Sequence, residues 1–136
     1  MAHSEVIDSL IATYRNLNMK IRPLGSTTAS DGQTALSAIA SLRESEIRAS
    51  QTIKLMTLGE VGAAMAIPEP PPSANPTNIR TLLSEFGTAR EAILATVREM
   101  PDEALAAERT GFEGASSINQ VLQQLIERDQ KLMQSI

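Results

Sequence analysis

The sequence predicts an all-α protein in which one domain, residues 1–136, folds as a four-helix bundle. Apolar residues recur at intervals of three and four in four separate segments, which is the spacing of one face of an α-helix. Hydrophobic residues make up 42% of the chain, but it holds only two Phe, one Tyr and no Trp. The interior must therefore be filled by Leu, Ile, Met and Ala, which favours close-packed helices over an aromatic-rich sheet.

The first two helices are expected over residues 4–22 and 33–58, on either side of the turn-rich stretch GSTTASDG. Ser4 is a suitable N-cap for the first helix, and Pro23 stands near its end because proline cannot continue a helix. The apolar stripe of the first helix consists of Ile7, Leu10, Leu17, Ile21 and Leu24. The stripe of the second consists of Ala35, Ile39, Leu42, Ala49, Ile53 and Met56.

A proline-rich crossover, residues 59–76, is expected to join the two halves of the domain. Its five prolines are incompatible with a regular helix or a central strand, and they favour an extended, semi-rigid path. The crossover is therefore a connector within one domain and not a boundary between two.

The third helix is expected to begin near Thr77, capped by that residue or by Asn75, and to end before Pro101. Its stripe consists of Ile79, Leu83, Phe86, Ile93, Val97 and Met100. Part of the following loop, residues 102–108, is able to form one short helical turn. Ser116 or Ser117 is expected to cap the fourth helix. The stripe of the fourth helix consists of Ile118, Leu122, Leu125, Leu132 and Ile136.

The two halves resemble each other. A shift of 76 positions carries the first stripe, from Ile7 to Leu24, onto apolar residues. A shift of 83 does the same for the second stripe from Ala35 to Ile53. This match indicates an internal duplication. With a crossover long enough to run the length of a bundle, it predicts an up-down-down-up topology in which the second and third helices are parallel.

Each stripe also passes through one polar residue near the middle of its helix. These residues are Tyr14, Glu46, Arg90 and Asp129. An ionised carboxylate loses its hydration in a bundle core and needs a partner there. The guanidinium of Arg90 can hold one carboxylate bidentately, and the Tyr14 hydroxyl can donate to the other. The sequence therefore predicts one shared polar layer at mid-bundle.

Three interpretations of this layer stay open. The one we favour is a structural ion-pair cluster that fixes the register of the helices. In the second, the layer is the floor of a pocket in which paired carboxylates and an arginine orient a small polar ligand. In the third, the helical phase drifts and one or two of the four groups reach solvent at the edge of the bundle.

Several functional classes are disfavoured by composition. The net charge is −4 and the twelve Lys and Arg are scattered, so we expect no nucleic-acid partner. The chain has no long apolar run and its first residues do not look like a signal peptide, so we expect no membrane partner and a cytoplasmic location. With no Cys and a single His, at His3, the chain lacks a cysteine nucleophile and a Ser-His pair within the fold.

A family resemblance rests on two stretches of each half. "LLSEFGTAREAILATVREMPDEALAAE", then a glycine-containing loop and "SINQVLQQLIERDQKL", resembles the second half of DinB/YfiT-like proteins of the DinB superfamily, which are four-helix bundles. "VIDSLIATYRNLNMKIRPL" and "TALSAIASLRESEIRASQTI" resemble their first helical pair, so the resemblance covers almost the whole chain.

Many DinB-like proteins are metalloenzymes that bind Zn or Ni through one His on the second helix and an HxxxH pair on the fourth. The resemblance puts these positions at Ser41, Arg128 and Leu132, and a further position where members often carry His at Gln124. None of them is His here. The resemblance therefore implies a diverged member that has lost the metal site and needs no cofactor.

The expected function is a non-catalytic module that binds a small molecule or another protein, and the protein is not expected to be an enzyme. The alternative is a DinB-type metal-dependent enzyme, a thiol transferase or hydrolase-like protein, with an unusual site built on the carboxylates of Glu46 and Asp129. The resemblance implies a homodimer, which is common among DinB-like proteins, and the apolar surface that a small chain leaves exposed is consistent with one.

Overall fold

Every regular element of the chain that the structure describes is helical. The computed structural model describes residues 3–26, 30–58, 67–109, 112 and 116–135. The elements are α1 (His3–Ile21), the 3-10 helix η1 (Arg22–Ser26), α2 (Ser30–Thr57), α4 (Ile79–Arg98), the short α5 (Asp102–Ala106) and α6 (Ile118–Ser135). The predicted all-α class is confirmed, and α5 is the short turn that the sequence predicted after Pro101.

The helix ends follow local capping, with two corrections. Helix α1 begins at His3, so Ser4 lies within the helix and its predicted role as N-cap was wrong. Helix α4 begins after Asn78, whose side-chain oxygen accepts a hydrogen bond from the amide of Thr81 at 2.9 Å, so the predicted caps Thr77 and Asn75 were wrong. Ser117 precedes α6, and its hydroxyl accepts from the amide of Gln120 at 3.2 Å, as an N-cap should.

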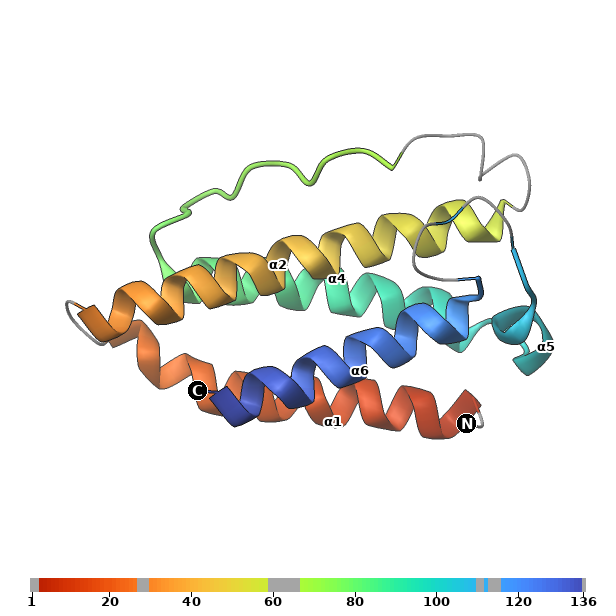
Figure 1. Ribbon diagram of the computed structural model, residues 1–136, viewed down its shortest axis with the longest axis horizontal. Coiled ribbons are helices and arrows are strands. Elements are labelled where there is room, and N and C mark those ends of the chain that lie inside the picture. Colours follow the sequence, from red (N-terminus) through yellow and green to blue (C-terminus); the bar gives the residue numbers. More distant parts are fainter. Residues whose placement is uncertain (1–2, 27–29, 59–66, 110–111, 113–115, 136) are drawn as a thin grey trace.

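The helices lie side by side with their midpoints at a similar level (Figure 1). In the view of Figure 1, α1 and α6 run from right to left, whereas α2 and α4 run from left to right. Helix α2 packs mainly against α4, and α1 packs mainly against α6. Residues near the middle of all four long helices are therefore brought to one level.

The apolar core is divided into two clusters. One consists of Val6, Leu10, Ala49, Ile53, Met56, Ile93, Leu94, Val97, Leu105, Ile118, Val121, Leu122, Leu125 and Ile126. The other consists of Leu17, Ile21, Ala35, Ile39, Leu42, Ile79, Leu82, Leu83 and Phe86. The border lies between Leu42 and Ala49 on α2 and between Phe86 and Ile93 on α4. Charged residues of the stripes fill this border.

The buried stripe of α1 differs from the predicted one. It consists of Val6, Leu10, Thr13, Leu17 and Ile21. Ile7 and Tyr14, which the sequence placed in the stripe, are half-buried at its edge. The N-terminal part of α1 is thus rotated by about one residue from the predicted phase. Thr13, and not Tyr14, faces the middle of the bundle.

Residues 59–66 of the predicted crossover lie outside the described residues. Residues 67–73 are in neither helix nor strand and pass along the bundle, and a turn at 74–77 then leads into α4 (Figure 1). This segment is fastened to α2 by Arg43, whose Nη2 donates to the carbonyl oxygen of Pro71 at 2.6 Å. The same guanidinium donates through Nε to Glu85 on α4 at 3.0 Å. Arg43 therefore joins three segments at once.

Glu85 makes the second attachment of the crossover. Its carboxylate accepts from the Ser73 hydroxyl at 2.5 Å and from the amide of Ala74 at 3.0 Å. Burial alone would raise the pKa of Glu85, but these hydrogen bonds and the charge of Arg43 outweigh it and lower the pKa below its ordinary value. We call Arg43, Ser73 and Glu85 the crossover latch.

Candidate functional site

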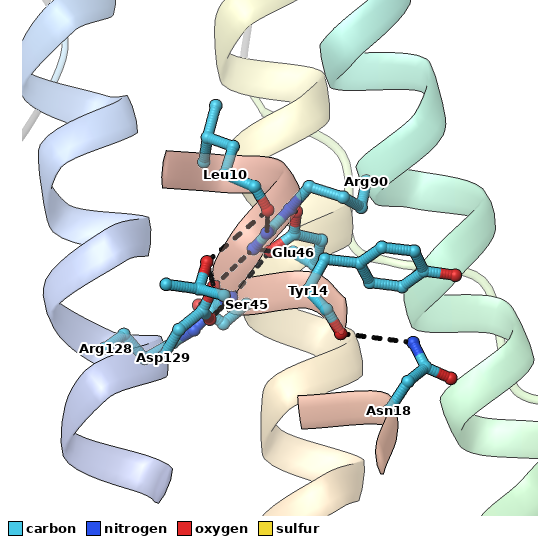
Figure 2. Close-up of polar contacts among 9 residues, drawn as sticks. Leu10, Tyr14, Asn18, Ser45, Glu46, Arg90, Arg128 and Asp129 are labelled. Carbon is cyan, nitrogen blue, oxygen red and sulfur yellow. Dashed lines mark hydrogen bonds and ion pairs between the residues drawn. The ribbon is translucent and has the colours of Figure 1, made fainter. Parts of the chain in front are cut away.

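The structure brings three of the four predicted stripe residues together at the border between the two apolar clusters. Glu46 on α2, Arg90 on α4 and Asp129 on α6 have no exposed surface. Figure 2 shows their side chains converging from three helices. They meet because each occupies a stripe position near the middle of its helix.

Arg90 is the centre of the hydrogen bonding. It donates to both carboxylate oxygens of Glu46, through Nε at 2.5 Å and Nη2 at 3.1 Å. Nη2 also donates to Oδ2 of Asp129 at 2.9 Å, and Nη1 donates to the carbonyl oxygen of Leu10 at 2.8 Å. The predicted bidentate pairing thus involves Glu46, and Arg90 bridges the second carboxylate as well (Figure 2).

Arg128 closes the arrangement from the other side, a role that the sequence did not suggest. Its Nη2 donates to Oε1 of Glu46 at 2.7 Å and to Oδ1 of Asp129 at 2.6 Å. Its Nη1 donates to the Ser45 hydroxyl at 2.9 Å. Two carboxylates and two guanidiniums therefore alternate, and their formal charges cancel. We call Glu46, Arg90, Arg128 and Asp129 the charged ring.

Thr13 supplies the hydroxyl that the sequence assigned to Tyr14. The Thr13 hydroxyl donates to Oδ2 of Asp129 at 2.7 Å. With this bond, each of the four carboxylate oxygens in the charged ring accepts at least one hydrogen bond. Complete pairing of this kind is what allows two ionised carboxylates to remain in a core.

Phe86 packs against both guanidiniums. The Cζ atoms of Arg90 and Arg128 lie 5.2 Å and 5.9 Å from its ring centre, within the range of a cation–π contact. Burial would lower the pKa of Arg90, but the hydrogen bonds and charges of Glu46 and Asp129 outweigh it and raise the pKa further. The charged form of Arg90 is therefore favoured by its surroundings.

Tyr14 is not part of this layer, and its predicted role was wrong. Its ring lies against Phe86, with centroids 5.7 Å apart, and Figure 2 shows it directed away from the carboxylates. The Tyr14 hydroxyl fits against α4 because residue 87 is a glycine: a Cβ atom on residue 87 would lie 2.6 Å from the hydroxyl oxygen. Gly87 thus lets the Tyr14 ring cross α4 at the edge of the bundle.

The four positions that the DinB resemblance assigned to metal ligands differ in their surroundings. Ser41 and Gln124 are exposed, whereas Leu132 is half-buried against the second apolar cluster. Only Arg128 is part of the charged ring. In the part of the chain that the structure describes, no group of three or more His, Cys, Asp or Glu side chains is arranged to hold a metal ion. The side chain of His3 lies outside the described residues.

A cleft of about 300 Å³ lies between α2 and α6, on the outer side of Arg128. Its lining consists of Ser45, Arg48, Ala49, Thr52, Val121, Gln124, Leu125 and Arg128. This lining carries two guanidiniums and no carboxylate. The Nε of Arg128 is buried, and no hydrogen-bond acceptor for it is present among the described residues. We call this hollow the α2–α6 cleft.

Comparisons of the chain with protein-family models, with curated proteins and with solved structures found no match. None of the described helices is both long enough and apolar enough to cross a lipid bilayer.

Proposed function

We propose that this protein is a DinB-like four-helix bundle of up-down-down-up topology that lacks the metal site of that family and binds a small anionic molecule in the α2–α6 cleft without catalysing a reaction. Two observations support the family assignment. The order of elements is helix, helix, extended proline-rich segment, helix, short helix and helix. Helices α2 and α4 also run in the same direction (Figure 1).

The observation that carries the proposed function is the position of Arg128. Where a DinB-like metal site would have an imidazole, this chain has a guanidinium that is 22% exposed and lines the cleft. Two of its nitrogen atoms bind the buried carboxylates and Ser45, which fixes the side chain in place. A cation held in this way is preorganised for an anion, because little side-chain entropy remains to be lost on binding.

The other lining residues of the α2–α6 cleft fit a small carboxylate or phosphate ester. Arg48 supplies a second guanidinium, which forms no ion pair with the residues that the structure describes. The hydroxyls of Ser45 and Thr52 can donate to oxygen atoms of the ligand, while Val121 and Leu125 offer apolar surface to its remainder. The cleft is at the lower end of the size range of small-molecule sites.

The test is a thermal shift measured at constant ionic strength with phosphate, acetate or benzoate in place of chloride. A ligand of the native state raises the unfolding midpoint in a saturable manner. We expect such a rise with at least one of these anions, and its loss in Arg48→Gln. Arg98→Gln, which removes an exposed charge from the end of α4, is the matched control and keeps the response. Equal responses in both variants would contradict the proposal.

The alternative, a metal-dependent thiol transferase or hydrolase-like enzyme, needs the carboxylates of Glu46 and Asp129 as ligands. Their oxygens already accept hydrogen bonds from Arg90, Arg128 and Thr13, and two fixed cations beside them would repel a divalent ion. Metal analysis of protein purified without chelator separates the two proposals. Stoichiometric Zn or Ni that is lost in Glu46→Ala would favour the enzyme.

The proposal also includes that the protein is a homodimer and that it is located in the cytoplasm. Another protein is the alternative to a small molecule as the bound partner. Leu58 after α2 and Ile67 are large hydrophobic side chains exposed on the described surface outside the two hollows, and they are the candidates for such contacts. Multi-angle light scattering over a tenfold concentration range tests the dimer. A monomer mass throughout that range would contradict it.

A further inference from the structure

A second hollow lies on a different face of the bundle, beside the C-terminal half of α1, η1 and the first turn of α4. Its volume is about 520 Å³, and Tyr14, Met19 and Pro23 contribute apolar surface to its lining. None of its lining residues is shared with the α2–α6 cleft. We call this hollow the α1–α4 groove.

Three arginines stand around this apolar surface. Arg15 and Arg22 come from α1 and η1, and Arg80 comes from α4. Among the described residues none of the three forms an ion pair, and no carboxylate lines the groove. Arg22 donates to the side-chain oxygen of Asn18 at the long distance of 3.5 Å. The groove thus concentrates positive charge on a chain whose net charge is −4.

The groove continues into a smaller hollow of about 400 Å³, which shares Asn18, Arg22 and Arg80 with it. Arg22 and Arg80 therefore stand where the two hollows meet, with apolar surface mainly on the Tyr14 and Met19 side. A cationic junction beside an apolar surface complements a molecule that has a charged end and an apolar body.

Met19 shows that the apolar surface is left open. Its side chain is 77% exposed, the most of any large hydrophobic residue in the described part of the chain. Burial of apolar area contributes roughly 25 cal/mol per Å², so an apolar group laid over Met19 and Pro23 gains free energy that a bare inorganic anion does not. An amphipathic occupant is therefore favoured over phosphate or acetate.

We infer that the α1–α4 groove binds a small amphipathic carboxylate, with its aliphatic chain over Tyr14, Met19 and Pro23 and its carboxylate between Arg22 and Arg80. A guanidinium fork matches a carboxylate in geometry as well as in charge. This site is separate from the proposed anion site in the α2–α6 cleft. Either site can be lost without the other.

The chain contains its own reporter for this groove. Tyr14 is its single Tyr and no Trp is present, so the fluorescence excited at the tyrosine band comes from one lining residue. Gly87 and Phe86 hold the Tyr14 ring in position, which keeps the signal specific to the groove.

The experiment is a titration of the intact protein with decanoate below its micelle concentration, followed by Tyr14 fluorescence. We expect a saturable change with decanoate and a much weaker one with decanol, which lacks the charge, or with acetate, which lacks the chain. Arg80→Gln should raise the dissociation constant about tenfold, the loss of one charge-assisted contact. Arg98→Gln, on the same helix but outside the groove, should leave it unchanged.

Met19→Ser should weaken decanoate binding as well, and it should leave the response to acetate as it is. Arg80 and Met19 are both exposed, so these variants keep the fold. Equal binding of decanol and decanoate, or equal affinities in Arg80→Gln and Arg98→Gln, would overturn the inference. Weaker binding in Arg48→Gln but not in Arg80→Gln would do the same, because the ligand would then be in the α2–α6 cleft.

Discussion

The charged ring and the crossover latch use the same chemistry in different surroundings. In the ring, Arg90, Glu46 and Asp129 are fully buried, whereas in the latch the side chains of Arg43 and Glu85 are 6% and 25% exposed. Water reaches the Glu85 side of the latch but not the centre of the ring. The loss of stability on removing one member of an ion pair therefore depends on whether the remaining charged side chain still has a hydrogen-bond partner or water beside it.

Arg90→Met is the change with the largest expected effect, because it removes the partner that Glu46 and Asp129 share inside the core. We expect a loss of about 3 kcal/mol in the free energy of unfolding, the range for breaking a buried ion pair. Urea denaturation measures it. A loss below about 0.5 kcal/mol, the size of an ordinary surface substitution, would contradict the buried ring.

A matched variant separates stranded charge from lost packing. Arg90→Met combined with Glu46→Leu and Asp129→Leu leaves no carboxylate in the layer, and apolar replacement of a whole buried ion cluster is often neutral or stabilising. We expect this triple variant to be more stable than Arg90→Met alone. Arg128 is partly exposed and can then turn toward solvent.

Arg128→Gln tests the exposed side of the ring. Glu46 and Asp129 keep their bonds to Arg90, and water can enter where Arg128 was. The expected loss is about 1.5 kcal/mol, a typical value for hydrogen bonds to a charged group. A loss as large as that of Arg90→Met in the same urea experiment would show that the two arginines are equally buried in solution.

Glu85→Gln removes the charge from the latch while the ring stays intact. We expect a loss of at most about 1 kcal/mol, because the Glu85 side chain is partly exposed and Arg43 keeps its hydrogen bond to Pro71. Glu91→Gln, an exposed position on the same helix, is the control and should change stability less. A larger loss of stability in Glu91→Gln than in Glu85→Gln would contradict a stabilising role for the latch.

The latch also predicts a dependence on acid. The folded pKa of Glu85 lies below its unfolded value, so its contribution is fully present above the unfolded pKa of about 4.3 and is lost as the pH falls through the folded pKa. The stability difference between the unmodified protein and Glu85→Gln should therefore be constant from pH 5 to 7 and shrink below about pH 4. A difference that grows in acid would have the wrong sign.

The parts of the fold and site that sequence could predict are those set by periodicity. The helical stripes predict Glu46, Arg90 and Asp129 at one level because each occupies a regular core position near the middle of its helix. On α1 the same reasoning placed Ile7 in the buried stripe and left Thr13 out, and both were wrong. Because α1 has apolar residues at neighbouring positions, its stripe fits two helical phases and periodicity does not choose between them. Thr13 was overlooked because a threonine in an apolar stripe carries no strong signal.

Arg128 could not be predicted from periodicity. It is next to Asp129, and neighbouring residues on a helix point in directions about 100° apart. It reaches the ring only because its side chain is long and because Ser45 and the carboxylates lie within its range. The α2–α6 cleft depends on the same three-dimensional fit, so no linear pattern reports it.

The most direct test of the central claim, that Arg128 links the buried ring to an anion site, is NMR of the arginine side chains during a titration with phosphate or benzoate. The Nε–H signals of Arg48 and Arg128 should shift in a saturable way, while those of buried Arg90 and distant Arg98 stay constant. Uniform small shifts of all four signals, or none at Arg128 up to saturating anion, would contradict the claim.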